Sequence, residues 1–197
     1  MKKLIQKLVS TLFEDSLFAD LYDDDEQESP WTDLQTKEIT DWLNKYRVTN
    51  YTINHDLTID VDGEVSIVNS VEDKTNLRGE RYTKAFKQLP DYIRFNHVKS
   101  FNFVDPICES LEGMPKIVDE TFRVCQCDSL QHLYGSPEKA ERYCIESCDA
   151  LIDFDGMTQD LNKINIENSG FTSTKGIPKH LEEFRIIRCQ GIEDLEV

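Results

Sequence analysis

A glycine-centred turn returns four times, at nearly constant spacing, in the second half of this chain. The turn glycines are 22, 21 and 20 residues apart: Gly113, Gly135, Gly156 and Gly176. Eight or nine residues after each glycine comes a pair of apolar residues separated by one residue: Phe122/Val124, Tyr143/Ile145, Ile164/Ile166 and Phe184/Ile186. A unit this short has too few apolar residues to bury a core alone. The pattern therefore predicts stacked units that share one core and one parallel sheet.

A third landmark strengthens the repeat. Three residues after the second apolar position stand Cys127, Cys148, Ser169 and Cys189. An apolar-x-apolar core followed by Cys or Asn is typical of leucine-rich-repeat coils. Phe101 and Phe103 open an earlier, degenerate unit. We therefore expect an α/β fold, with a short leucine-rich-repeat-like solenoid of four to five units over residues 89–197 and few regular helices in the repeats.

Residues 32–88 are predicted to form a helix and β-hairpin cap. Thr32 or Asp33 can cap the helix, whose apolar residues fall on one face. The hairpin is expected over residues 51–68. Apolar residues alternate on both sides of Asp62-Gly63, and this pair favours a tight hairpin turn.

Residues 1–22 have the spacing of an amphipathic helix, and residues 23–31 read as an acidic linker. The helix would place Leu4, Leu8, Leu12 and Phe13 on its apolar side. Two interpretations stand side by side. The helix could cover the open N-terminal edge of the solenoid, or it could dock on a partner or lie on a membrane surface.

The charge balance restricts the classes of partner. The chain has 38 acidic and 22 basic residues, for a formal net charge of -16. Such a chain repels phosphates, so direct nucleic-acid binding is not expected. A basic protein partner, or mimicry of DNA charge, is compatible with it. No run approaches the roughly 20 apolar residues of a membrane span, and we expect a cytoplasmic protein with reduced thiols.

The best functional candidates lie at outward strand positions. Inward and outward residues alternate along a strand, so Arg123, Cys144, Asn165 and Arg185 should form one row. Cys125, Glu146, Glu167 and Ile187 should form the next. Repeat proteins use such an extended concave face for recognition, so the predicted binding residues are Arg123, Glu146, Asn165, Glu167 and Arg185. The alternative is a merely solvated face.

The residues give little support to metal binding or to catalysis. Cys125-x-Cys127 and Cys144-x-x-x-Cys148 could suggest zinc, but the repeat explains Cys127, Cys148 and Cys189 as turn residues. The four histidines are dispersed, and no glycine-rich phosphate loop or nucleophile elbow is present. We expect no catalytic residues, no metal and no cofactor, and a protein that is not an enzyme.

Two stretches carry a family resemblance. They are residues 42–65, WLNKYRVTNYTINHDLTIDVDGEV, and the unit LEGMPKIV at residues 111–118 with its downstream Cys. Together with the repeats they resemble leucine-rich-repeat-like proteins common in tailed-phage genomes, over roughly residues 40–68 and 100–197. The unit at 156 departs from the pattern, with Thr158 in place of Pro and Ser169 in place of Cys.

The resemblance implies a phage origin, a repeat fold and the cytoplasm of a host cell. The expected function is a protein-binding module that interferes with, or scaffolds, a host or phage protein complex. Two alternatives stay open. One is an acidic DNA mimic that inhibits a nucleic-acid-binding host protein, and the other is a structural protein packaged in the virion.

Overall fold

A computed structural model describes residues 30–68, 74–75, 81–82, 89–104 and 107–191. The chain divides into two compact units, Met1–Asp33 and Leu34–Val197, and the second is a parallel β-solenoid of about four turns. Among the described elements α2 (Pro30–Lys45) is the only helix. The fold is therefore mostly β rather than α/β. Its return segments are irregular because each carries a turn glycine, and most also carry a proline.

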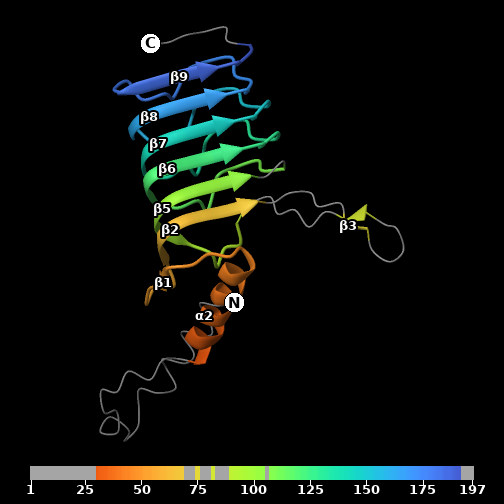
Figure 1. Cartoon of the computed structure of the whole chain (residues 1–197), viewed down its shortest axis with the longest axis vertical. Coiled ribbons are helices and arrows are strands. Elements are labelled where there is room, and N and C mark those ends of the chain that lie inside the picture. Colours follow the sequence, from red (N-terminus) through yellow and green to blue (C-terminus); the bar gives the residue numbers. More distant parts are fainter. Residues whose placement is uncertain (1–29, 69–73, 76–80, 83–88, 105–106, 192–197) are drawn as a thin grey trace, which may run out of the picture. The chain divides into compact units, whose positions relative to one another are not determined.

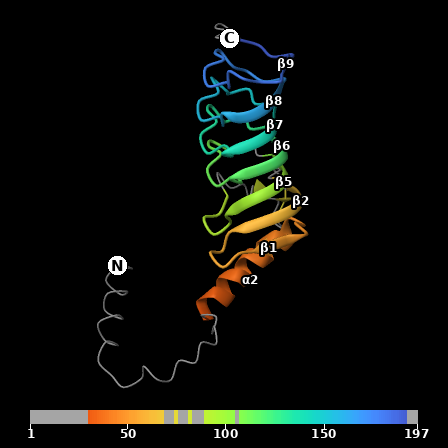
Figure 2. The ribbon, with the colours of Figure 1, turned by 90° about the vertical axis from the view of Figure 1, so that its left-hand side faces the viewer.

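One seven-stranded sheet organises the solenoid, in the order β1-β2-β5-β6-β7-β8-β9 (Figures 1 and 2). Only the β1–β2 pair is antiparallel; every later pair is parallel. The strands of this sheet are β1 (Tyr51–Ile53), β2 (Ile59–Val68), β5 (Phe95–Val104), β6 (Ile117–Cys125), β7 (Lys139–Glu146), β8 (Asp160–Glu167) and β9 (Glu183–Ile187). A separate two-stranded sheet joins β3 (Lys74–Thr75) and β4 (Arg81–Tyr82).

The core is a set of side-chain columns that run across the strands. Phe101, Phe122 and Tyr143 pair in direct register, and all three are fully buried. Phe101 and Phe122 stack with ring centroids 5.9 Å apart, and Phe122 meets Tyr143 edge-on at 4.9 Å. The predicted inward positions, including the early unit at Phe101 and Phe103, are confirmed by this register.

The hairpin predicted with its turn at Asp62-Gly63 is wrong. β1 pairs with the first residues of β2, so the chain reverses at residues 54–58, where Leu57 adopts a φ of +61°. Asp62-Gly63 instead lies at an irregularity within β2, which continues to Val68 and pairs in parallel with β5. Ile59, Val61 and Val65 alternate with less buried residues, so one strand buries all three despite the shift in register between Val61 and Glu64.

β2 is thus the first solenoid strand, so the solenoid begins well before residue 89. The cap consists of α2 and β1. Helix α2 begins at Pro30, two residues before Thr32, and buries Ile39 and Leu43. Trp42 meets Phe95 edge-on with centroids 6.2 Å apart, which ties the helix to the first coils. The helix predicted over residues 1–22, with Leu4, Leu8, Leu12 and Phe13, lies outside the described residues, as do residues 23–29 of the predicted linker.

The repeated glycines stack where neighbouring coils approach most closely. All four have φ between +86° and +92°, a region that L side chains rarely adopt. A Cβ on Gly135 would lie 2.3 Å from the backbone nitrogen of Glu112, and one on Gly156 would lie 2.6 Å from the backbone of Tyr134. At Gly135, Gly156 and Gly176 the period in the sequence therefore marks the points where one backbone rests on the next.

A second column marks the opposite corner, directly after each strand. Gln126, Ser147, Asn168 and Arg188 all have φ between +49° and +56°. Their amides continue the ladder: Gln126 donates to the Glu146 carbonyl at 2.9 Å, and Ser147 donates to the Glu167 carbonyl at 3.0 Å. The left-handed residue turns the chain inward, which carries the following Cys or Ser into the core.

The last coil is less well covered than the others. Phe184 is 41% exposed although its partner Ile164 is 1% exposed. Among the described strands, none pairs with the outer edge of β9. The core therefore thins toward the C-terminal end of the described solenoid.

Replacing Gly156 with alanine should destabilise the fold by at least about 2 kcal/mol. The positive φ alone costs an alanine about 1–2 kcal/mol, and the added Cβ also meets the Tyr134 backbone. Urea unfolding followed by circular dichroism measures the difference.

Gly63→Ala is the matched control, because a Cβ there meets nothing within 4 Å and no positive φ is required. The urea concentration at which this variant is half unfolded should stay close to that of the wild type. Equal midpoints for Gly156→Ala and the wild type would contradict the role given to the glycine column.

Candidate functional site

The outward face of the sheet carries three parallel rows of side chains, each crossing β2 and β5 to β9. The middle row is Ser66, Asn102, Arg123, Cys144, Asn165 and Arg185, all in direct register. The end row is Val68, Val104, Cys125, Glu146, Glu167 and Ile187. The first row is Glu64, Ser100, Thr121, Arg142, Lys163 and Glu183, at the same parity two residues earlier.

The five predicted binding residues come together on this face. Arg123, Asn165 and Arg185 stand in the middle row, and Glu146 and Glu167 are neighbours in the end row. The predicted register of both rows is confirmed. The first row was missed, although the same alternation, read two residues earlier, identifies Arg142, Lys163 and Glu183.

Arg123 and Arg142 are the two cations of this face without an acidic partner among the described residues. Arg185 differs, because its Nε lies 2.5 Å from a Glu183 carboxylate oxygen. Lys163 is also paired, at 3.0 Å from Glu141 and 3.7 Å from Glu182. Two exposed guanidinium groups therefore keep their charge available to a ligand.

Two shallow depressions of about 260 Å³ each flank Arg123. One is lined by Glu64, Ser100, Phe101, Asn102, Thr121 and Arg123. The other is lined by Arg123, Arg142, Cys144, Asn165, Glu183 and Arg185, and is called the arginine depression below.

Each depression contains a buried amide oxygen without a hydrogen-bond donor among the described residues. The atoms are Oδ1 of Asn102 and Oδ1 of Asn165. The amide nitrogen of Asn102 donates to Ser66 Oγ at 3.2 Å, so only its oxygen is unused. A buried polar atom without a partner costs about 1–3 kcal/mol. Both oxygens are inaccessible to solvent as they stand, so a ligand donor recovers this cost only if the amide side chain turns toward the depression.

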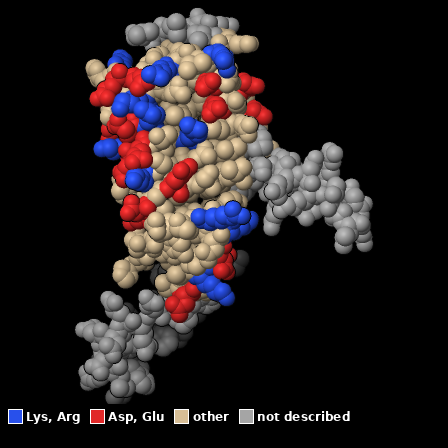
Figure 3. Space-filling model, in the orientation of Figure 1, with Lys and Arg blue, Asp and Glu red and all other residues tan. Residues whose placement is uncertain are grey.

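The end row is apolar at both ends and acidic between them, because it begins at Val68 and finishes at Ile187. Val68 is 49% exposed at one end, while Glu146 and Glu167 stand side by side further on. In Figure 3 charged residues crowd the side on which the strands begin, and a largely uncharged area fills the middle of the view. The outward face is thus a mosaic of both charges rather than an acidic surface.

Exposed ion pairs join neighbouring coils, one at the first residues of two strands and others within the strands. Lys139 lies 3.7 Å from Asp160, and Lys99 lies 3.7 Å from Glu120. Hydrogen bonds from Lys163 and Asn162 hold the pKa of the Glu141 carboxyl below its usual value. Such pairs are solvated and contribute little to stability, so they fit a role in aligning coils.

The cysteines lie where the repeat predicts. The thiols of Cys127, Cys148 and Cys189 each approach the backbone carbonyl two residues earlier, at 3.4, 3.6 and 3.5 Å. Ser169 makes the same contact at 3.0 Å, so its hydroxyl replaces a thiol without loss of the bond. Cys125 and Cys144 face outward yet are 9% and 7% exposed, because neighbouring side chains cover them.

Burial governs the thiol chemistry. It raises the pKa of Cys125 to about 12, and it raises the pKa of Cys144 despite the nearby guanidinium groups of Arg123 and Arg142. Thiols with raised pKa values stay protonated and react slowly. Within the described part of the chain, no group of three or more His, Cys, Asp or Glu residues is arranged to hold a metal ion.

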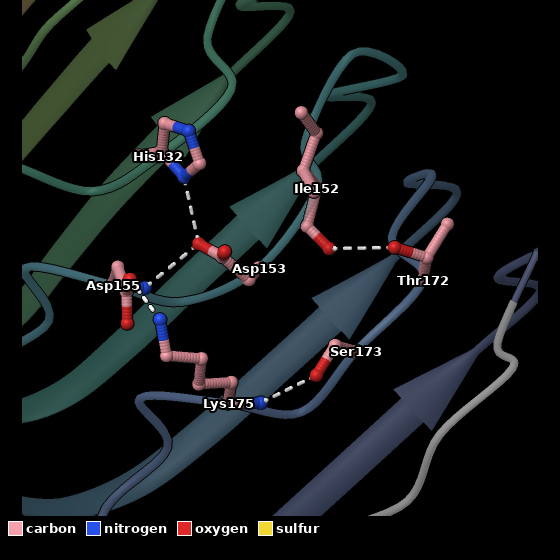
Figure 4. A network of polar contacts seen from close by, with 7 residues as sticks. All are labelled: His132, Ile152, Asp153, Asp155, Thr172, Ser173 and Lys175. Atoms are coloured by element: carbon pink, nitrogen blue, oxygen red, sulfur yellow. Dashed lines mark hydrogen bonds and ion pairs between the residues drawn. The ribbon is translucent and has the colours of Figure 1, made fainter.

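A polar network lies on the turns behind the sheet (Figure 4). His132 Nδ1 lies 2.7 Å from Asp153 Oδ1, which also accepts the backbone N–H of Asp155 at 3.0 Å. Lys175 donates to the Asp155 carboxylate at 2.6 Å. Burial is the largest influence on the Asp153 carboxyl and raises its pKa, but hydrogen bonds and nearby cations hold the pKa below the usual value. The network links three successive coils.

None of the described helices is long and apolar enough to cross a membrane.

Only Cys189 should react quickly with Ellman's reagent in the folded protein, because it alone among the six cysteines is not buried. The other five should react at the rate of unfolding. Cys189→Ser should remove the fast phase. A fast phase that persists in this variant would contradict the burial of the column.

Asp153→Asn should lower stability at pH 7 by about 1 kcal/mol, because it removes the charged acceptor of His132. A carboxyl whose pKa is lowered on folding stabilises the fold above its unfolded pKa, near 3.8. This contribution disappears as the pH falls through the lower, folded value. The difference between wild type and variant should therefore shrink below about pH 4, as measured by urea unfolding at each pH.

Asp119→Asn is the matched control. His97 and Asp119 form a similar pair at 2.8 Å, but both side chains are about half exposed. This variant should lose much less stability than Asp153→Asn at pH 7. A loss as large as that of Asp153→Asn would show that burial does not set the strength of these pairs.

Comparison of the chain with known protein families, with characterised proteins and with solved structures found no match to any of the three.

Proposed function

We propose that this protein is a non-enzymatic binding module that recognises another protein through the outward face of β6 to β9. The observation that carries the proposal is the middle row. It combines a guanidinium group without an acidic partner, on Arg123, with an amide oxygen of Asn165 that lacks a donor. Both groups are held by a rigid backbone ladder, so little order is lost on binding.

Protein–protein interfaces are enriched in arginine, and arginine is common among the residues that contribute most to binding. The mixture of Arg123, Arg142, Glu146 and Glu167 suits a partner surface that also carries both charges. The described surface therefore gives no particular support to mimicry of DNA, which requires an array of acids alone.

The same proposal includes the family and the origin of the protein. A leucine-rich-repeat-like protein of phage origin would use this face to occupy or scaffold a protein complex in the host cell. The sequence resemblance of residues 42–65 and of the repeats supports this assignment.

A pull-down of the tagged full chain from bacterial lysate, read by quantitative mass spectrometry, tests the proposed face. Arg123→Ala/Asn165→Ala/Arg185→Ala should lose at least about 90% of a specific captured protein, since several charged hydrogen bonds contribute more than tenfold in affinity. The loss should be seen at both low and moderate salt.

Lys116→Ala/Gln131→Ala/Lys179→Ala is the matched control. It removes two cations and one amide from exposed positions outside the rows, and it should capture as the wild type does. Equal loss in both variants would count against the face. Loss only in full-length Leu4→Ser/Leu8→Ser/Leu12→Ser would move the site to the N-terminal segment.

A further inference from the structure

The arginine depression has the composition of an anion site. Its lining brings together guanidinium groups from β6, β7 and β9, those of Arg123, Arg142 and Arg185. Glu183 neutralises Arg185 through its contact of 2.5 Å. Arg123 and Arg142 have no such partner among the described residues, so the depression carries an excess of positive charge.

The floor of the depression does not offset that charge. Cys144 forms part of the lining and is only 7% exposed, and burial keeps its thiol protonated by raising its pKa. The neighbouring Asn165 is uncharged. A ligand anion would therefore meet two guanidinium groups over a neutral floor, where charge-assisted hydrogen bonds are stronger than in open water.

Asn165 places a second requirement on the ligand. Its buried Oδ1 has no donor among the described residues, and an oxygen of this kind accepts a hydrogen bond. A bare inorganic anion at the arginines would leave it unsatisfied. This oxygen is inaccessible to solvent as it stands, so a ligand donor reaches it only when the amide of Asn165 turns toward the depression. A ligand that then completes the site carries a negative group and an N–H or O–H donor a few ångströms away.

The flanks of the depression disfavour a continuous polyanion. Glu146 and Glu167 stand one row beyond Cys144 and Asn165, at a separation of about 7 Å along each strand. Glu183 lies within the lining itself. A nucleic-acid backbone crossing the face would bring its phosphates against these carboxylates, whereas one isolated anion would not.

We propose that the arginine depression binds the carboxylate of an aspartate or glutamate side chain in an extended segment of the partner protein. Arg123 and Arg142 donate to the carboxylate, and Asn165 accepts a backbone N–H of the same segment once its amide turns toward the ligand. Guanidinium groups match carboxylates in a planar, two-bond geometry, and an extended peptide supplies its N–H close to the side chain. This inference rests on the proposed function and names the chemical class of its ligand.

The test is an NMR titration of the ¹⁵N-labelled full chain with end-blocked pentapeptides. The probes are acetyl-Gly-Ser-Glu-Gly-Ser-amide, its glutamine counterpart and its phosphoserine counterpart, with a single-stranded DNA decamer as a fourth. The glutamate peptide should shift the backbone amides of Cys144 and Asn165 and the Asn165 side-chain amide. Its affinity should exceed that of the glutamine peptide about tenfold, the usual gain from a charge-assisted pair.

Arg123→Gln/Arg142→Gln should abolish this preference, leaving both peptides equally weak. Lys116→Gln/Lys179→Gln changes the net charge equally at exposed positions outside the depression and should keep the preference within about twofold, since distant surface charges are screened. Retention of the preference in the arginine variant would overturn the proposal.

The remaining outcomes separate the ligand class from the function. Equal binding of the glutamate and glutamine peptides, or binding of only phosphoserine or DNA, overturns the carboxylate assignment. If a captured protein is nevertheless lost in the middle-row variant, protein binding stands and only its ligand class fails. If no protein is captured and no peptide binds, both fail together.

Discussion

The parallel backbone ladder is the constraint on which the rest of this molecule depends. Strands that share hydrogen bonds stand about 4.8 Å apart, so equivalent residues of successive coils are brought into line. The same spacing forces a glycine where one turn rests on the next, as at Gly156. It also aligns core rings such as Phe122 and Tyr143, and it turns isolated outward residues into continuous rows.

Those rows acquire chemistry only because neighbouring coils differ. Lys163 has acids on both sides, so its charge is used within the solenoid. Arg123 has Asn102 and Cys144 as row neighbours, so its charge is left for a ligand. The middle row therefore does not offer free binding groups along its whole length. Its unmet polar groups are confined to the depressions around Arg123.

Much of this arrangement follows from the sequence, because period and parity are local properties of the chain. The spacing of the turn glycines predicts stacked coils, and the alternation around Phe122 and Val124 predicts which residues face outward. The prediction of an antiparallel hairpin with its turn at Asp62-Gly63 is wrong for a physical reason. Asp62-Gly63 suits a tight turn and a β-bulge equally well, and only pairing with a distant strand, β5, decides between them.

The depression itself was beyond prediction from periodicity. Whether Arg142 has an acidic neighbour, or whether Asn165 finds a donor, depends on side-chain positions across coils and not on spacing along the chain. The burial of the outward Cys144 is of the same kind. Alternation alone would leave it exposed, yet surrounding side chains cover it.

The thin coverage of β9 has a consequence for how the molecule comes apart. Each coil touches only its neighbours, so the stability of a coil depends mainly on the two coils beside it. With Phe184 41% exposed, the last coil contributes less than a coil packed on both sides. Local opening therefore begins at that end while the inner coils stay folded. Residues of the rows nearest β9 would lose their fixed positions first, while Arg123 lies on β6, further from that end of the sheet.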